Sequence, residues 1–117
     1  FLRTLAALDL HTQITPIQLG IRLLIPEGSL LLDLQEIRKL VGLFDARALY
    51  YPWHNPDPSL DALCGTIQET IKREEKRRTP RAEIFRQIWD LAQTGEFPDL
   101  PLASRATIPY LTEPWYC

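Results

Sequence analysis

Few residues of this chain have side chains suited to chemistry, and they are scattered. There are two cysteines, Cys64 and Cys117, and two histidines, His11 and His54, among 117 residues. No CxxC or HxxxH spacing joins them, and the sequence contains no GxSxG, P-loop or GxGxxG motif. The spacing therefore predicts no complete metal site, no nucleophile elbow and no phosphate-binding loop.

Each of these side chains has a structural explanation beside a chemical one. Cys64 lies on the apolar face of an expected helix, where a thiol is buried and unreactive, and no partner stands at a spacing that would activate it. His54 has the chemistry of an acid–base group, but its aromatic neighbours at 50–53 favour simple packing. His11 is expected to be an ordinary residue at a helix end.

Two charged residues accompany the most apolar stretch, "IRLLIPEGSLLLDL". Arg22 is a charge inside an expected apolar strand, and Glu27 follows Pro26 at the end of that strand. In α/β proteins, functional sites lie beyond the carboxyl ends of parallel strands, and a charge that points inward there needs a partner or a ligand. A ligand-binding role for Arg22 and Glu27 therefore stands beside a structural one.

The run "KREEKRRTPR", residues 72–81, carries six basic side chains. It fits a phosphate-binding patch, but it also fits a solvated helix end, because basic residues suit the negative end of a helix dipole and acidic residues stand one turn away. The chain has a formal net charge of −2, whereas nucleic-acid-binding domains usually carry a basic excess. The solvated helix end is therefore favoured, and nucleic acid is disfavoured as a partner.

Hydrophobic periodicity predicts the elements that position these residues in the first half of the chain. Residues 2–11 have the spacing of a helix, and 17–25 alternate as a strand with one apolar face. Residues 30–42 are expected to form a helix that ends at a glycine, and 46–51 a second strand.

The second half is predicted to be helical and then irregular. Asp57-Pro58 is a strong helix start, and the helix it opens is expected to run to about Arg78. A last helix is expected over about 80–94, ended by Gly95. Its buried stripe and that of the helix before it are expected to comprise Leu60, Leu63, Cys64, Ile67, Ile71, Ile84, Phe85, Ile88, Leu91 and Ala92.

These elements predict an α+β fold, mostly helical with about two short strands, of the kind found in a fragment of a partial α/β barrel. Three segments are expected: 1–51 as helix-strand-helix-strand, 52–95 as a two-helix segment, and 96–117 as an extended proline-rich tail. Without methionine, and with a start inside a helical pattern, the chain is expected to be a piece of a longer protein.

The sequence has no run of 18 apolar residues and no pattern of a signal peptide, so neither a membrane nor secretion is expected. Two cysteines far apart in such a chain are expected to be reduced thiols, which is typical of the cytoplasm.

Three stretches, "LGIRLLIPEGSLLL", "YYPWHNPDPSLDAL" and the final "TIPYLTEPWYC", resemble the C-terminal third of radical SAM proteins whose tails read Cys-Cys-Ala-Glu-Pro or Cys-selenocysteine-Ala-Glu-Pro. The resemblance spans nearly the whole chain, and the tail is its most specific part. It implies that this chain is the C-terminal fragment of an Fe-S oxidoreductase whose substrate is unknown.

The resemblance also implies cofactors that this piece does not hold alone. Radical SAM enzymes bind a 4Fe-4S cluster through CxxxCxxC, and the cluster cleaves S-adenosylmethionine to a 5′-deoxyadenosyl radical. This chain has no CxxxCxxC, so the fragment is expected to be inactive by itself. The late barrel strand of the family approaches S-adenosylmethionine, which makes Arg22, Glu27 and Gly28 candidate cofactor-binding residues.

The family's tail continues past the position of Cys117. A UGA codon that encodes selenocysteine, if read as a stop, would end the chain there. The resemblance therefore makes Cys117 a candidate redox residue, one half of a Cys–selenocysteine or Cys–Cys pair.

Two partners follow from this interpretation. One is the missing N-terminal part of the same protein. The other is a second copy, because strand 17–25 taken out of a barrel would leave an unpaired edge that a dimer could cover. The alternative interpretation is a small helical interaction domain with no catalysis.

Overall fold

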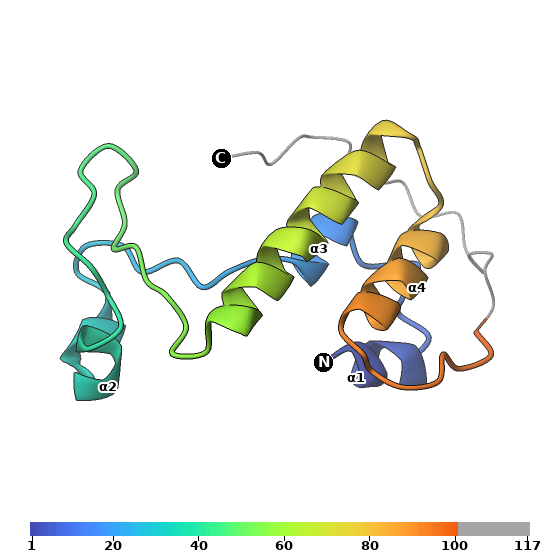
Figure 1. Cartoon of the computed structure of the whole chain (residues 1–117), viewed down its shortest axis with the longest axis horizontal. Helices are drawn as coiled ribbons and strands as arrows, with labels where there is room; N and C mark the ends of the chain where they lie inside the picture. Colours follow the sequence, from blue (N-terminus) through green and yellow to red (C-terminus); the bar gives the residue numbers. More distant parts are fainter. Residues whose placement is uncertain (101–117) are drawn as a thin grey trace.

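The computed structural model describes residues 1–100, which form two lobes of different character (Figure 1). The helical lobe contains α1 (Leu2–Ala7), the 3-10 helix η1 (Pro16–Leu19), α3 (Pro58–Lys76) and α4 (Arg81–Leu91). The loop lobe, residues 21–56, contains the 3-10 helix η2 (Leu30–Asp33) and the short helix α2 (Gln35–Arg38).

The core lies wholly in the helical lobe. α3 and α4 pack against each other through Ile67, Ile71, Ile84 and Ile88. A second cluster joins α4 to α1 through Ala6, Phe85 and Trp89. Leu19 of η1 packs against both clusters. α1, η1, α3 and α4 therefore share one core.

The start of α3 follows the sequence pattern. The Asp57 carboxylate accepts a hydrogen bond from the Ser59 amide at 2.9 Å, and Pro58 occupies the first turn, where its missing N–H costs nothing. α3 therefore starts where the sequence predicts. It ends at Lys76, close to the expected end, and Arg78 adopts the left-handed conformation that reverses the chain into α4.

The predicted α+β fold is wrong, because the described part of the chain contains no strand, sheet or barrel. The first expected strand, 17–25, begins inside the 3-10 helix η1, since Pro16 has its φ fixed for a first helical turn. The rest of that segment is extended without a ladder. The second expected strand, 46–51, takes part in isolated bridges, which are Pro26↔Tyr50 and Asp45↔Tyr50.

The helix expected over 30–42 is also reduced. It forms as η2 and α2, separated by Leu34, whose extended backbone (ψ 125°) interrupts the hydrogen bonding. Two short helical turns replace one longer helix.

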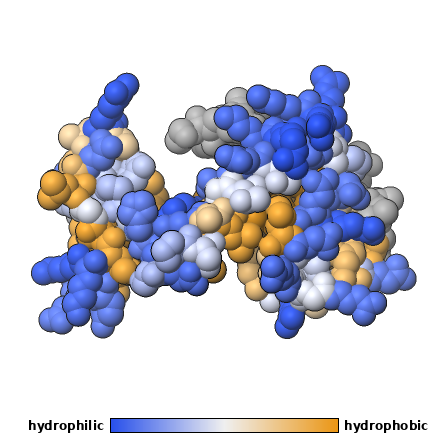
Figure 2. All heavy atoms as spheres, viewed as in Figure 1, coloured by the Kyte–Doolittle hydropathy of each residue, from blue (hydrophilic) through white to orange (hydrophobic). Residues whose placement is uncertain are grey.

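The loop lobe has almost no core of its own. Ile25 is its single buried residue, with an exposed fraction of 2%. Its apolar side chains lie largely in solvent, and Figure 2 shows this hydrophobic surface on the lobe that contains α2. The radius of gyration is 16.5 Å, whereas about 13 Å is expected for a compact domain of this length.

No helix within residues 1–100 is long and apolar enough to cross a membrane.

Candidate functional site

Arg22 lies at the junction of the two lobes and contacts two other segments, one at Trp53 and one at Asp61. Its Nη2 donates to the Trp53 carbonyl at 2.9 Å and lies 3.1 Å from Oδ1 of Asp61 in α3. Its guanidinium also stacks over the Trp53 ring, 4.4 Å from the centroid. Trp53 in turn donates from Nε1 to the Leu23 carbonyl at 2.8 Å. The charge that the sequence places inside an apolar segment is therefore satisfied by protein groups.

Asp61 is the centre of this junction. Its Oδ2 accepts from the Asn55 amide at 3.1 Å and lies 3.3 Å from Nδ1 of His54. His54 does not pack deeply among the neighbouring aromatic rings, because 87% of its side chain is exposed. We call these residues, Arg22, Trp53, His54 and Asp61, the junction cluster.

Partial burial by itself raises the pKa of Asp61. The hydrogen bonds from the Asn55 amide and His54, together with the charge of Arg22, outweigh that effect and lower its pKa below the ordinary value of 3.8. Asp61 is therefore a carboxylate at neutral pH, and it is an acceptor rather than an acid. A carboxylate that orients an exposed imidazole is also found in acid–base sites, but here it is shared with Arg22.

Glu27 and Gly28 do not join the junction cluster. Both are exposed in the turn after Pro26, and Gly28 has a positive φ of 75° with no neighbour within 4 Å of an added Cβ. No hydrogen bond or ion pair of the described residues connects Glu27 to Arg22. The structure thus does not bring the three candidate cofactor-binding residues together.

Cys64 and His11 are not part of the junction cluster. Cys64 is a free, half-buried thiol with its Sγ 3.8 Å from the Gly20 carbonyl oxygen. His11 is buried against Phe85, with ring centroids 5.8 Å apart, and its Nδ1 lies 3.4 Å from Asp9. Cys117 lies outside the described residues.

The basic run 72–81 forms the end of α3 and the turn after it. Glu74, buried within it, is contacted by Arg73 at 2.8 Å, by Arg77 at 3.3 Å and by the Thr79 hydroxyl at 2.8 Å. Two of the six basic side chains thus hold a buried carboxylate, which supports a structural role at the helix end.

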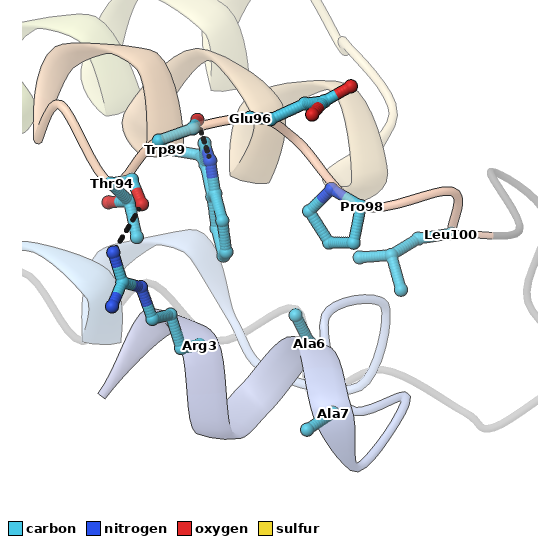
Figure 3. Close-up of a pocket in the computed structure, with 9 residues that line it drawn as sticks. Arg3, Ala6, Ala7, Trp89, Thr94, Glu96, Pro98 and Leu100 are labelled. Atoms are coloured by element: carbon cyan, nitrogen blue, oxygen red, sulfur yellow. Dashed lines mark hydrogen bonds between the residues drawn. The ribbon is translucent and has the colours of Figure 1, made fainter.

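An open pocket lies between α1 and the segment that follows α4 (Figure 3). Ala6, Trp89, Pro98 and Leu100 line much of it, and its volume of about 520 Å³ is in the range of small-molecule sites. Arg3 crosses one end and donates to the Thr94 carbonyl at 2.9 Å. The lining is mainly apolar, and Arg3, Thr94 and Glu96 are its polar side chains, so it offers a largely apolar binding surface.

The sequence pattern missed Asp61 and Trp53 as partners of Arg22. One signal was present, since Asp61 stands one turn after the cap residue Asp57, on a helix start that follows "YYPWHN". That signal places a carboxylate near the start of α3, but it does not say which distant cation would reach it.

The described residues do not fit an iron-sulfur cluster. Cys64 is the one cysteine among residues 1–100, and no group of three or more His, Cys, Asp or Glu side chains in that range could hold a metal ion. No family model, curated protein or solved structure matches this chain.

Proposed function

We propose that this chain is the C-terminal segment of a radical SAM Fe-S oxidoreductase and is inactive alone. The observation that supports the proposal is the junction cluster. Two of the stretches that carry the resemblance, around Arg22 and around Trp53–Asp61, lie far apart in the sequence and contact each other directly. They behave as one structural unit, as parts of one family motif would.

The proposal assigns the iron-sulfur cluster and S-adenosylmethionine to other parts of a longer protein. The missing N-terminal part of the same protein is then the principal partner. A cytoplasmic location fits the free thiol Cys64. Arg22 acts in this proposal by holding the two motif stretches together, since its guanidinium is already shared by Asp61 and Trp53.

Two experiments test the proposal. The coding sequence upstream of Phe1, read in frame, is expected to encode CxxxCxxC. The codon after that of Cys117 is expected to be UGA or a cysteine codon. The full-length protein, expressed anaerobically with iron, is expected to show cluster absorbance and to release 5′-deoxyadenosine from S-adenosylmethionine. A start codon directly before Phe1 would refute the proposal.

A second candidate is a small helical interaction domain without catalysis. It is favoured by the loop lobe, whose apolar residues such as Leu30 and Leu43 are 83% and 91% exposed. The same reading of the coding sequence separates the two candidates, because a complete interaction domain requires no upstream cluster motif.

A further inference from the structure

We propose that two copies of this chain associate through residues 21–25, which pair antiparallel across a two-fold axis. The inference is independent of the proposed function. It begins from the backbone of the extended segment that follows η1 and runs between the two lobes (Figure 1).

One edge of this segment is occupied and the other is open. The Ile25 carbonyl accepts from the Tyr51 amide at 2.8 Å, and the Leu23 carbonyl accepts from the Trp53 ring at 2.8 Å. Successive residues of an extended chain direct their backbone groups to opposite edges. The N–H and C=O groups of Arg22 and Leu24 therefore face away from 50–53, and within residues 1–100 they make no hydrogen bond.

The side chains beside this open edge are also uncovered. Ile21 is 75% exposed and Leu24 is 62% exposed. An extended apolar segment with free donors and acceptors is a template for another extended segment.

The net charge of the loop lobe and its exposed apolar area favour the same segment of a second copy as the partner. The loop lobe has no net charge, so two copies do not repel each other there. Its four basic residues are Arg22, Arg38, Lys39 and Arg47, and its four acidic residues are Glu27, Asp33, Glu36 and Asp45.

The apolar side chains of this lobe that are at least half exposed are Ile21, Leu23, Leu24, Leu30, Leu34, Leu43 and Leu49. Without Leu49, which lies outside the proposed contact, the other six at roughly 100 Å² each offer roughly 600 Å² per copy, against the roughly 800 Å² that a stable interface buries on each side.

The open edge fixes the register. Arg22 of one copy exchanges two backbone hydrogen bonds with Leu24 of the other, and the symmetric pair does the same. Leu23 then faces Leu23 of the second copy across the axis in a non-hydrogen-bonded pair. The ladder stops on both sides, because Pro26 has no N–H and the Gly20 carbonyl already accepts from Gln68 Nε2 at 2.8 Å.

This register makes a cross-linking test specific. Facing Cα atoms in such a pair lie about 4.5 Å apart, which suits a disulfide. In a Cys64→Ala, Cys117→Ser background, Leu23→Cys is expected to form a covalent dimer on mild oxidation. Leu49→Cys, which is exposed on the same lobe but outside the segment, is the matched control and should form no covalent dimer. Equal cross-linking of the two variants would overturn the register.

A second measurement does not depend on cysteine. Wild-type protein at tens of micromolar is expected to be a dimer by light scattering. Leu24→Pro removes an outward N–H that makes no hydrogen bond within residues 1–100 and is expected to weaken dimerisation at least tenfold, whereas Leu24→Val keeps the N–H and should not. Circular dichroism checks that the helices are unchanged. A monodisperse wild-type monomer would overturn the proposal.

Discussion

At the scale of single residues, Arg22 joins both lobes because a guanidinium can serve three partners at once. It stacks on Trp53, donates to the carbonyl of the same residue and pairs with Asp61. A lysine ammonium has neither the planar surface nor the forked donors for this arrangement. The type of this residue matters more than its charge.

We expect Arg22→Lys to destabilise the chain by about 1 kcal/mol, because the stacking and the fork are lost. Arg22→Ala should cost more and should leave the Trp53 ring more accessible to acrylamide. Urea unfolding followed by tryptophan fluorescence measures the loss of stability, and acrylamide quenching measures the accessibility of the Trp53 ring. Arg47→Ala, which removes an exposed cation of the loop lobe, is the control and should be neutral. An unchanged midpoint for Arg22→Lys would show that charge alone suffices.

Because of the environment of Glu74, we expect the folded chain to lose stability in acid. Hydrogen bonds from Arg73 and then Thr79 lower the pKa of Glu74 below its ordinary value of 4.5, against the opposing effect of burial. A carboxyl whose pKa is lower when folded binds its proton more weakly in the folded state. Its stabilisation is therefore complete above pH 4.5 and is lost as the pH falls through the lowered folded value.

Asp57 and Asp61, whose pKa values are also lowered, add to this loss at slightly lower pH. Thermal unfolding as a function of pH measures the effect. Glu74→Gln should flatten the acid limb below pH 4.5, and Glu83→Gln, on α4, should leave it unchanged. An identical acid limb for wild type and Glu74→Gln would contradict the assignment.

At the scale of elements, the two longest helices, α3 and α4, could be predicted from the sequence, whereas the strands and the helix expected over 30–42 could not. A helix closes its hydrogen bonds locally, so the cap at Asp57 and the apolar period of α3 and α4 define it in advance. A strand needs a partner that the sequence does not name. Residues 17–25 alternate as a strand would, but in the described chain they pair with no other strand, and the nearest bridge is Pro26↔Tyr50.

The difference between local and long-range contacts also explains which buried residues and which site contacts the sequence could indicate. Five of the ten residues of the predicted stripe are buried, namely Ile67, Ile71, Ile84, Phe85 and Ile88. Leu63, Cys64, Leu91 and Ala92 are half-buried, and Leu60 is 49% exposed, so the prediction is wrong for Leu60. Trp89, also buried, was missed because it lies beside the expected stripe, on the face that α1 covers. The contact between Arg22 and Asp61 joins positions far apart in the chain, so no local pattern could indicate it.

Substitutions at two glycines are expected to change the stability in opposite directions, because the space around each glycine differs. At Gly20 an added Cβ would lie 3.2 Å from Ile67 Cγ2 and 3.2 Å from Ile71 Cδ1, so η1 approaches α3 closely. Gly65, inside α3, has no such neighbour within 4 Å. We expect Gly20→Val to destabilise by about 1–3 kcal/mol through overpacking.

Gly65→Ala should instead stabilise by roughly 0.5–1 kcal/mol, because alanine favours the helix. Chemical denaturation of both variants provides the test. Destabilisation by Gly65→Ala would mean that its surroundings are more crowded than the structure has them.

At the scale of the whole molecule, stability is distributed unevenly. The helical lobe holds eight of the nine buried apolar residues, and the loop lobe holds Ile25 alone. Opening of the loop lobe therefore exposes little buried apolar surface to water, whereas separation of α3 from α4 exposes the core.

Hydrogen exchange should reflect this difference. At low micromolar concentration, amides in the middle of α3 and α4 are expected to exchange roughly a hundredfold or more slowly than those of residues 27–49. Mass spectrometry of peptic peptides resolves the two lobes. Uniform protection along residues 1–100 would show that they open as a single cooperative unit.

The contact of Arg22 with Asp61 has a further consequence for how this architecture could change. The chain leaves the helical lobe just before Arg22 and returns at Asp61, and these side chains meet at 3.1 Å. Residues 23–60 therefore form an insertion whose two ends lie next to each other. Such a cassette can be lengthened, replaced or excised at little entropic cost, because closure depends only weakly on loop length. The helices would keep their arrangement while the insertion acquired a different role.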